Sequence, residues 1–145
     1  MIKITHNAGF FSCCSMKLYE IIHFINLNKR LPDNVDSSEQ FRWYKQNTNK
    51  DITFDYFEHY KNVPDVNIIH PIKYHWEHQF INYAKLDYKR ITPLIKKYFS
   101  PSAEINEIIY NIEKKYNLLY ENICVLFYRG NDKIKETNKC SYDEY

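Results

Sequence analysis

The chain has 145 residues, 44% of them hydrophobic, and a formal net charge of +2. That length allows one domain with a substantial core, and that apolar content argues against intrinsic disorder. The 20 Lys and Arg residues are interleaved with 18 acidic ones, so the sequence lacks the basic surface typical of a nucleic-acid-binding protein. No apolar run approaches the roughly 20 residues that span a bilayer, and the N-terminus lacks the apolar region of a signal peptide. We therefore expect a cytoplasmic protein with no membrane span and no nucleic-acid partner.

The cysteines and histidines show no spacing typical of a metal site. Cys13 and Cys14 are adjacent rather than two residues apart, and the segment HPIKYHWEH does not form an H-E-x-x-H motif. We expect reduced thiols and no bound metal. The abundance of Tyr, Phe, Asn, Ile and Lys suggests an AT-rich genome, viral or bacterial.

The N-terminal segment predicts a strand, a glycine turn and a helix. Apolar and polar residues alternate over 2–6, and apolar residues recur at helical spacing over about 13–28, with Ser12 as the expected cap. Gly9 is one of only two glycines, so we expect it where the backbone geometry demands glycine. A helix N-terminus after such a turn is a favourable place for an anion.

The central part of the chain predicts further short elements. Patterning favours a short strand over 34–36 and helices over 38–45, 76–89 and 91–99. The helix that follows Pro101 is the clearest in the sequence. Its expected buried stripe consists of Ile105, Ile108, Ile109, Ile112 and Tyr116.

The apolar run Ile123–Tyr128 predicts a strand that is buried on both faces of a parallel sheet. Together with the strand and helix at the N-terminus, it favours an α/β fold. Ligands of such folds bind at the carboxyl ends of the strands.

The last five residues of this run and the five residues after it form the strongest motif, CVLFYRGNDK. Arg129 is suited to a phosphate because its guanidinium forms paired, charge-assisted hydrogen bonds. Gly130 allows a close backbone approach, Asp132 can orient the arginine or a hydroxyl, and Lys133 adds a second cation. The same residues can equally form a surface turn with an Arg–Asp ion pair.

This motif resembles the donor motif of the fucosyltransferase superfamily, which includes core, nodulation and protein O-fucosyltransferases. There it reads approximately H-V-R-R-T-D-K, and the matching stretch here is FYRGNDK. The resemblance assigns Arg129 to the arginine that contacts the donor β-phosphate, and Asp132 and Lys133 to the D-K pair. Phe127 replaces the histidine, and Gly130 replaces the second arginine.

The turn at Gly9 resembles the first loop of the same family, roughly G-x-F/G-x-N/Q before a helix. Gly9, Phe11 and Ser12 occupy the matching positions, with Ser12 in place of the usual Asn or Gln. The sequence ETNKCSYDEY resembles the family's continuation into a further helix, whereas Asn28–Ser100 aligns with nothing in the family.

The resemblance implies a Rossmann-like open parallel sheet with flanking helices, the N-terminal half of a GT-B-type glycosyltransferase. Residues 1–120 would form the N-terminal α/β domain, and 121–145 would begin a truncated nucleotide-sugar-binding domain, so we expect the fragment alone to be inactive. The implied reaction is inverting transfer of fucose from GDP-fucose to an unknown glycan or protein acceptor, with no metal or other cofactor. Arg129 would be catalytic; the donor-binding residues would be Gly9, Phe11, Ser12, Gly130, Asn131, Asp132 and Lys133.

Two alternatives remain open at this point. The chain can be a non-catalytic α/β binding or scaffold domain whose aromatic residues serve a protein partner. It can also be a different phosphate-handling enzyme that uses the same Arg129.

Overall fold

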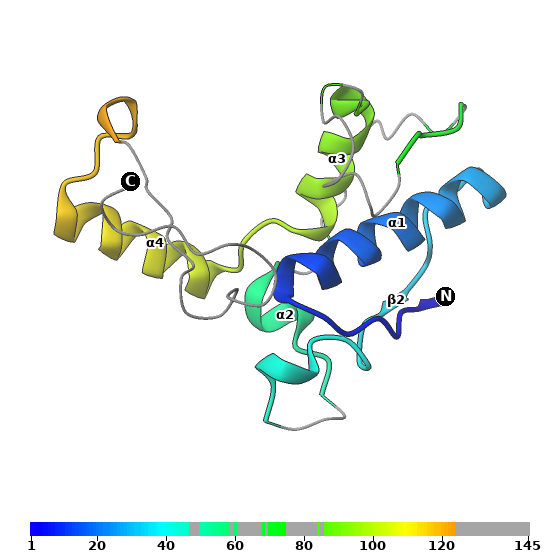
Figure 1. Cartoon of the computed structure of the whole chain (residues 1–145), viewed down its shortest axis with the longest axis horizontal. Helices are drawn as coiled ribbons and strands as arrows, with labels where there is room; N and C mark the ends of the chain where they lie inside the picture. Colours follow the sequence, from blue (N-terminus) through cyan, green and yellow to red (C-terminus); the bar gives the residue numbers. More distant parts are fainter. Residues whose placement is uncertain are drawn as a thin grey trace, which may run out of the picture. The chain divides into compact units, whose positions relative to one another are not determined.

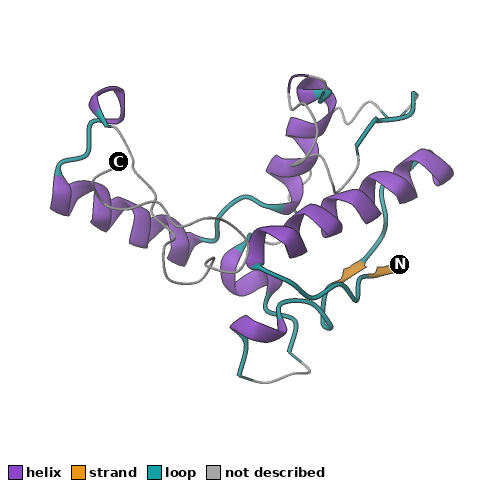
Figure 2. Cartoon of the chain, viewed as in Figure 1, coloured by secondary structure: helices purple, strands orange, loops and turns teal. Residues whose placement is uncertain are grey.

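The chain begins with a strand that pairs in parallel with a second strand more than thirty residues later. The structure, a computed structural model, describes residues 1–46, 50–58, 60, 68, 70–74, 84 and 86–123. Its elements are β1 (Ile2–Lys3), α1 (Phe10–Asn28), β2 (Val35–Asp36), the 3₁₀-helix η1 (Arg42–Tyr44), α2 (Thr53–Tyr56), α3 (Tyr88–Tyr98), α4 (Ala103–Tyr116) and the 3₁₀-helix η4 (Tyr120–Asn122). Helices form most of the described regular structure (Figure 2).

The strand pair confirms the two short strands expected near 2–6 and 34–36. Ile2 pairs with Val35 and Lys3 with Asp36, and these two strands are the whole sheet in the described part of the chain. The Rossmann-like sheet therefore stays a prediction, because the expected strand over 123–128 lies almost entirely outside the described residues.

Helix α1 follows β1 and has one buried face, as its periodicity predicts. It ends at Asn28 because Lys29 adopts a left-handed conformation, with φ at 54°, and donates its backbone N–H to the Ile25 carbonyl. This end agrees with the helical spacing predicted over about 13–28. Figure 1 shows α1 between β2 and α3.

The main core lies between α1, the strand pair and α3. Its buried members include Ile21 and Ile25 of α1, Val35 of β2 and Leu94 of α3. The helix α3 overlaps the predicted helical segment 91–99 but begins earlier, at Tyr88, and most of the helix predicted over 76–89 lies outside the described residues. The N-terminus of α3 is capped by Asp87, whose side chain accepts from the Arg90 N–H. A smaller cluster of Cys13, Phe41 and Ile52 lies beside this core.

Helix α4 confirms the clearest helix prediction, but its expected burial is wrong. Ser102 precedes it and accepts a hydrogen bond from the Ile105 N–H through its hydroxyl, at 3.3 Å. No residue of α4 is buried, and its exposed apolar side chains include Ile108, Ile109, Ile112 and Tyr116. The chain divides into two units at this helix, Met1–Tyr110 and Asn111–Tyr145, and the predicted domain boundary near residue 120 stays a prediction.

Lys17 is a charged residue on the buried face of α1, and its side chain is 0% exposed. Its Nζ donates to the Thr53 hydroxyl at 3.2 Å and lies 5.5 Å from the ring centre of Tyr60. Burial lowers the pKa of Lys17 to about 8, although the nearby Asp51 opposes this shift. Lys17 lies four residues from both Cys13 and Ile21, and all three residues are on the buried face of α1.

The charge of Lys17 is expected to cost stability at neutral pH. The folded pKa of about 8 lies below the ordinary value of 10.5, so between these values the unfolded state binds more protons. The contribution of Lys17 to the free energy of unfolding therefore rises with pH between about 8 and 10.5. Below this range the buried amine is charged, and its full destabilising effect applies. At about 1.4 kcal/mol per pKa unit, it amounts to roughly 3 kcal/mol.

We predict that Lys17→Met stabilises the protein by about 2 kcal/mol at pH 7, because the loss of the Thr53 hydrogen bond offsets part of the relieved penalty. The advantage should shrink by about 2 kcal/mol between pH 7 and 9.5. Urea unfolding at several pH values measures it. Lys73→Met, at an exposed lysine, is the matched control and should change stability by less than about 0.5 kcal/mol. A pH-independent loss of stability in Lys17→Met would contradict the prediction.

Candidate functional site

The loops that follow β1 and β2 meet at the carboxyl edge of the strand pair. Asn7, in the first loop, donates from its side-chain amide to the Glu39 carbonyl in the second loop. Its Oδ1 accepts a hydrogen bond from the Arg42 backbone N–H at 3.1 Å. One side chain thus connects the loop after β1 with both ends of the 39–42 segment after β2.

The second loop carries two buried polar atoms without a protein partner. Gln40 is 0% exposed and donates through Nε2 to the Cys13 carbonyl at 3.1 Å and the His6 carbonyl at 3.4 Å. Its Oε1 and the Oγ of the buried Ser37 accept or donate no hydrogen bond in the described structure. Buried polar atoms are normally paired, so both atoms have spare capacity for a ligand or a water molecule.

The N-terminal turn of α1 opens at the same edge. Gly9 is the residue before the helix, and the Phe10 N–H donates to the Tyr44 hydroxyl at 2.9 Å. Within the described residues, the backbone N–H groups of Phe11 and Ser12 donate to no acceptor. The first turn contains no acidic residue. Free N–H groups and the helix dipole make this turn suitable for an anion.

His6 adds a titratable ring next to this turn. Its Nε2 lies 3.1 Å from the Ser12 hydroxyl, and which of the two donates depends on the tautomer. The pair holds the Ser12 side chain against the end of the first loop. It also places a proton donor or acceptor beside the helix N-terminus.

The loop after β2 stores backbone strain next to this turn. Phe41 is buried and has φ at 60°, a left-handed conformation that is unusual for a bulky residue. Its ring lies 5.2 Å from that of Phe10, so packing holds it in place. Strained residues of this kind gather at ligand sites.

The three site residues expected at this turn have different outcomes. Gly9, Phe11 and Ser12 do lie together at the start of α1, but Ser12 is not its cap, because the helix begins earlier, at Phe10. Gly9 has φ at −55° and ψ at 154°, which any residue adopts, and a Cβ there would meet nothing within 4 Å. The expectation that the backbone demands glycine at this position is therefore wrong.

The remaining predicted site residues are Arg129, Gly130, Asn131, Asp132 and Lys133, and all of them lie outside the described residues. Their roles stay predictions. The sequence reasoning did not single out His6, Gln40 or Tyr44, which lie at the described edge. Polar residues in short loops follow no periodic pattern in the sequence. The role of these three side chains is therefore visible only from their hydrogen bonds in the structure.

A second feature is a cavity of about 290 Å³ beside the first turns of α1. Its apolar walls come from α1, α3 and two connecting segments: Phe10, Phe11, Leu18, Phe57, Ile95 and Phe99. Cys14 also lines it, and burial raises the pKa of this thiol to about 12, so it is protonated at physiological pH. Cys13 and Cys14 are both free, which confirms the reduced thiols expected at these two positions.

The described residues contain neither a metal-holding cluster nor a membrane-spanning helix. No group of three or more His, Cys, Asp or Glu side chains there is arranged to hold a metal ion. None of the helices in the described part combines the length and the apolar character needed to cross a bilayer.

We predict that Asn7→Ala destabilises the protein by about 1–2 kcal/mol, because it removes hydrogen bonds between two loops and leaves partners unpaired. Asn28→Ala is the matched control, since the Asn28 side chain is exposed and bonds only within its own helix, to the Phe24 carbonyl. Thermal unfolding of both variants measures the difference. Equal stability of the two would show that Asn7 does not hold the loops together.

The sequence and the structure were compared with known proteins. No protein-family model, no curated protein and no solved structure matches this chain.

Proposed function

We propose that the chain binds a nucleotide-sugar donor, GDP-fucose, at the carboxyl edge of the strand pair and belongs to a glycosyl-transfer enzyme. The observation that carries the proposal is the open N-terminal turn of α1, where the Phe11 and Ser12 N–H groups can donate to an anion and no acidic side chain lies in the first turn to compete.

The proposed chemistry follows from the arginine motif in the sequence. An acceptor hydroxyl oxygen attacks the anomeric carbon of fucose while the bond to the β-phosphate oxygen breaks, which inverts the anomeric configuration. The hydroxyl proton leaves to a base, and negative charge grows on the departing GDP. Arg129 neutralises that charge and Lys133 assists, so the stabilisation is electrostatic. No metal is required for this arrangement.

A second candidate, a non-catalytic binding or scaffold domain, is favoured by one specific observation. The apolar side chains of α4 are exposed, and they follow the helical spacing of a buried stripe. An unpartnered stripe of this kind is typical of an interaction surface. Under this reading the chain would bind no nucleotide.

We predict that GDP-fucose binds this chain in ligand-detected NMR. Arg129→Ala should weaken binding about 10- to 100-fold, because it removes charge-assisted hydrogen bonds to a phosphate. Lys73→Ala, at an exposed cation on another segment, is the control and should leave binding unchanged. No binding of GDP-fucose would remove the transferase proposal and leave the scaffold alternative.

We also predict that Gly9→Asp separates stability from donor binding. There is space for the new side chain, and a carboxylate at this position caps α1 and complements its dipole, so stability should rise by about 1 kcal/mol. The same carboxylate should weaken GDP-fucose binding at least about tenfold by repelling the diphosphate.

Gly9→Asn is the matched variant, because it caps the helix without a charge. It should stabilise α1 and weaken donor binding less than Gly9→Asp does. If both variants bind GDP-fucose as tightly as the unchanged protein, the diphosphate does not bind at this helix end.

A further inference from the structure

The cavity beside α1 is separate in character from the polar edge of the strand pair. It is lined by nine residues, and five of them are aromatic: Phe10, Phe11, Phe57, Tyr74 and Phe99. All of these residues belong to the first unit of the chain, so the cavity is formed within that unit.

Two pairs of rings around the cavity meet edge to face. Phe10 and Phe11 have centroids 5.6 Å apart with an interplanar angle of 88°, and Phe57 and Phe99 lie at 5.4 Å and 84°. Such contacts add attraction beyond the burial of apolar area. A planar ring in the cavity can continue this series of contacts, whereas a flexible chain cannot.

The volume of the cavity limits the size of its occupant. An engineered apolar cavity of about 150 Å³ binds benzene. A cavity of about 290 Å³ therefore has room for two fused rings. This lies near the lower end of the range for small-molecule sites.

The polar atoms in the walls indicate an uncharged occupant. Ser15 and Tyr74 share a hydrogen bond between their hydroxyl groups at 2.8 Å, and both residues line the cavity. The remaining polar lining group is the Cys14 thiol, so no lysine, arginine, aspartate or glutamate lines the walls. A charged group in the cavity would gain no ionic partner from these walls.

We propose that this cavity binds a small, uncharged, bicyclic aromatic molecule of the size of indole. The phenylalanine rings of the walls contact the faces and edges of the bound ring. The cavity shares Phe11 with the proposed donor site, but it uses the side chain of this residue and not the backbone N–H.

The experiment is a titration of the chain with 5-fluoroindole, followed by ¹⁹F NMR, with methyl NOEs to locate the bound ring. We expect a dissociation constant of about 0.1–1 mM and NOEs to the methyl groups of Leu18 and Ile95. Hexan-1-ol should bind roughly two- to tenfold more weakly, because it lacks ring contacts. Indole-3-acetate should bind at least about tenfold more weakly because of its carboxylate.

A filling variant tests the position of the site. Ile95 lines the cavity and is 44% exposed, so Ile95→Trp should place its own indole ring in the cavity and weaken 5-fluoroindole binding at least about tenfold. Ile109→Trp makes the same change at an exposed helical isoleucine that does not line the cavity, and it should bind as the unchanged protein does.

Three results would overturn the proposal: no saturable binding, NOEs that exclude Leu18 and Ile95, or binding of hexan-1-ol as tight as that of 5-fluoroindole. The NOE measurement uses the unchanged protein, so it decides the question even if Ile95→Trp does not fold. Loss of GDP-fucose binding with retained indole binding would remove the proposed function and leave this site intact.

Discussion

The burial of one face of α1 is the constraint on which the first unit of the protein depends. Ile21, Ile22 and Ile25 are each at most 1% exposed, and they pack with Val35 of β2 and Leu94 of α3. Because β1, β2 and α3 all pack against α1, they hold its N-terminal turn at the carboxyl edge of the strands. The open N–H groups and the aromatic cavity therefore have fixed positions on the same helix, one at its end and one along its side.

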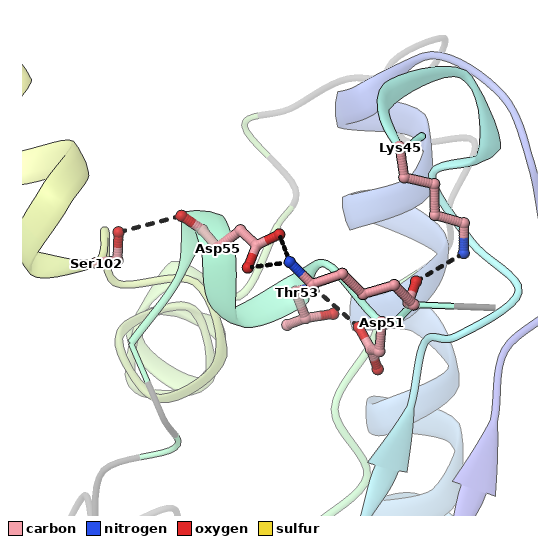
Figure 3. A network of polar contacts seen from close by, with 6 residues as sticks. Lys45, Asp51, Thr53, Asp55 and Ser102 are labelled. Carbon is pink, nitrogen blue, oxygen red and sulfur yellow. Dashed lines mark hydrogen bonds and ion pairs between the residues drawn. The ribbon is translucent and has the colours of Figure 1, made fainter. Parts of the chain in front are cut away.

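The loop after β2 is fixed by a second, polar set of contacts. Asp51 accepts from the Thr53 N–H at 2.9 Å and from the Ser37 N–H at 3.0 Å, which links α2 to the end of β2. Figure 3 shows Asp51 and Thr53 in this network, with Asp55 accepting through its carbonyl from the Ser102 hydroxyl. The Thr53 hydroxyl in turn accepts from Lys17. The buried amine is thus a costly group that also connects α1 to the segment that orders the loop.

Periodicity predicted those parts of the fold that follow from local pattern. The strand pair, the buried face of α1, and the helices α3 and α4 were confirmed, because apolar spacing and caps such as Ser102 act within a few residues. Contacts across long separations were not predictable: Lys17 looks like a surface cation, and its burial depends on Thr53 and the ring of Tyr60. The edge residues Asn7 and Gln40 were missed for the same reason, since their partners lie in another loop. In α4 the pattern identified which face is apolar, but amphipathicity does not specify what covers that face.

The polar edge and the aromatic cavity place opposite demands on their surroundings, and Phe11 belongs to both. Its backbone N–H is one of the open donors at the helix end, while its side chain lines the cavity and is otherwise exposed. An anion at the helix end gains from an uncharged neighbourhood, because a lower local dielectric strengthens its interaction with the N–H groups. An apolar ring in the cavity would exclude water from Phe11 and so strengthen that interaction further. The two ligands would then favour each other's binding through Phe11, and linkage requires this coupling to be the same in either order of addition.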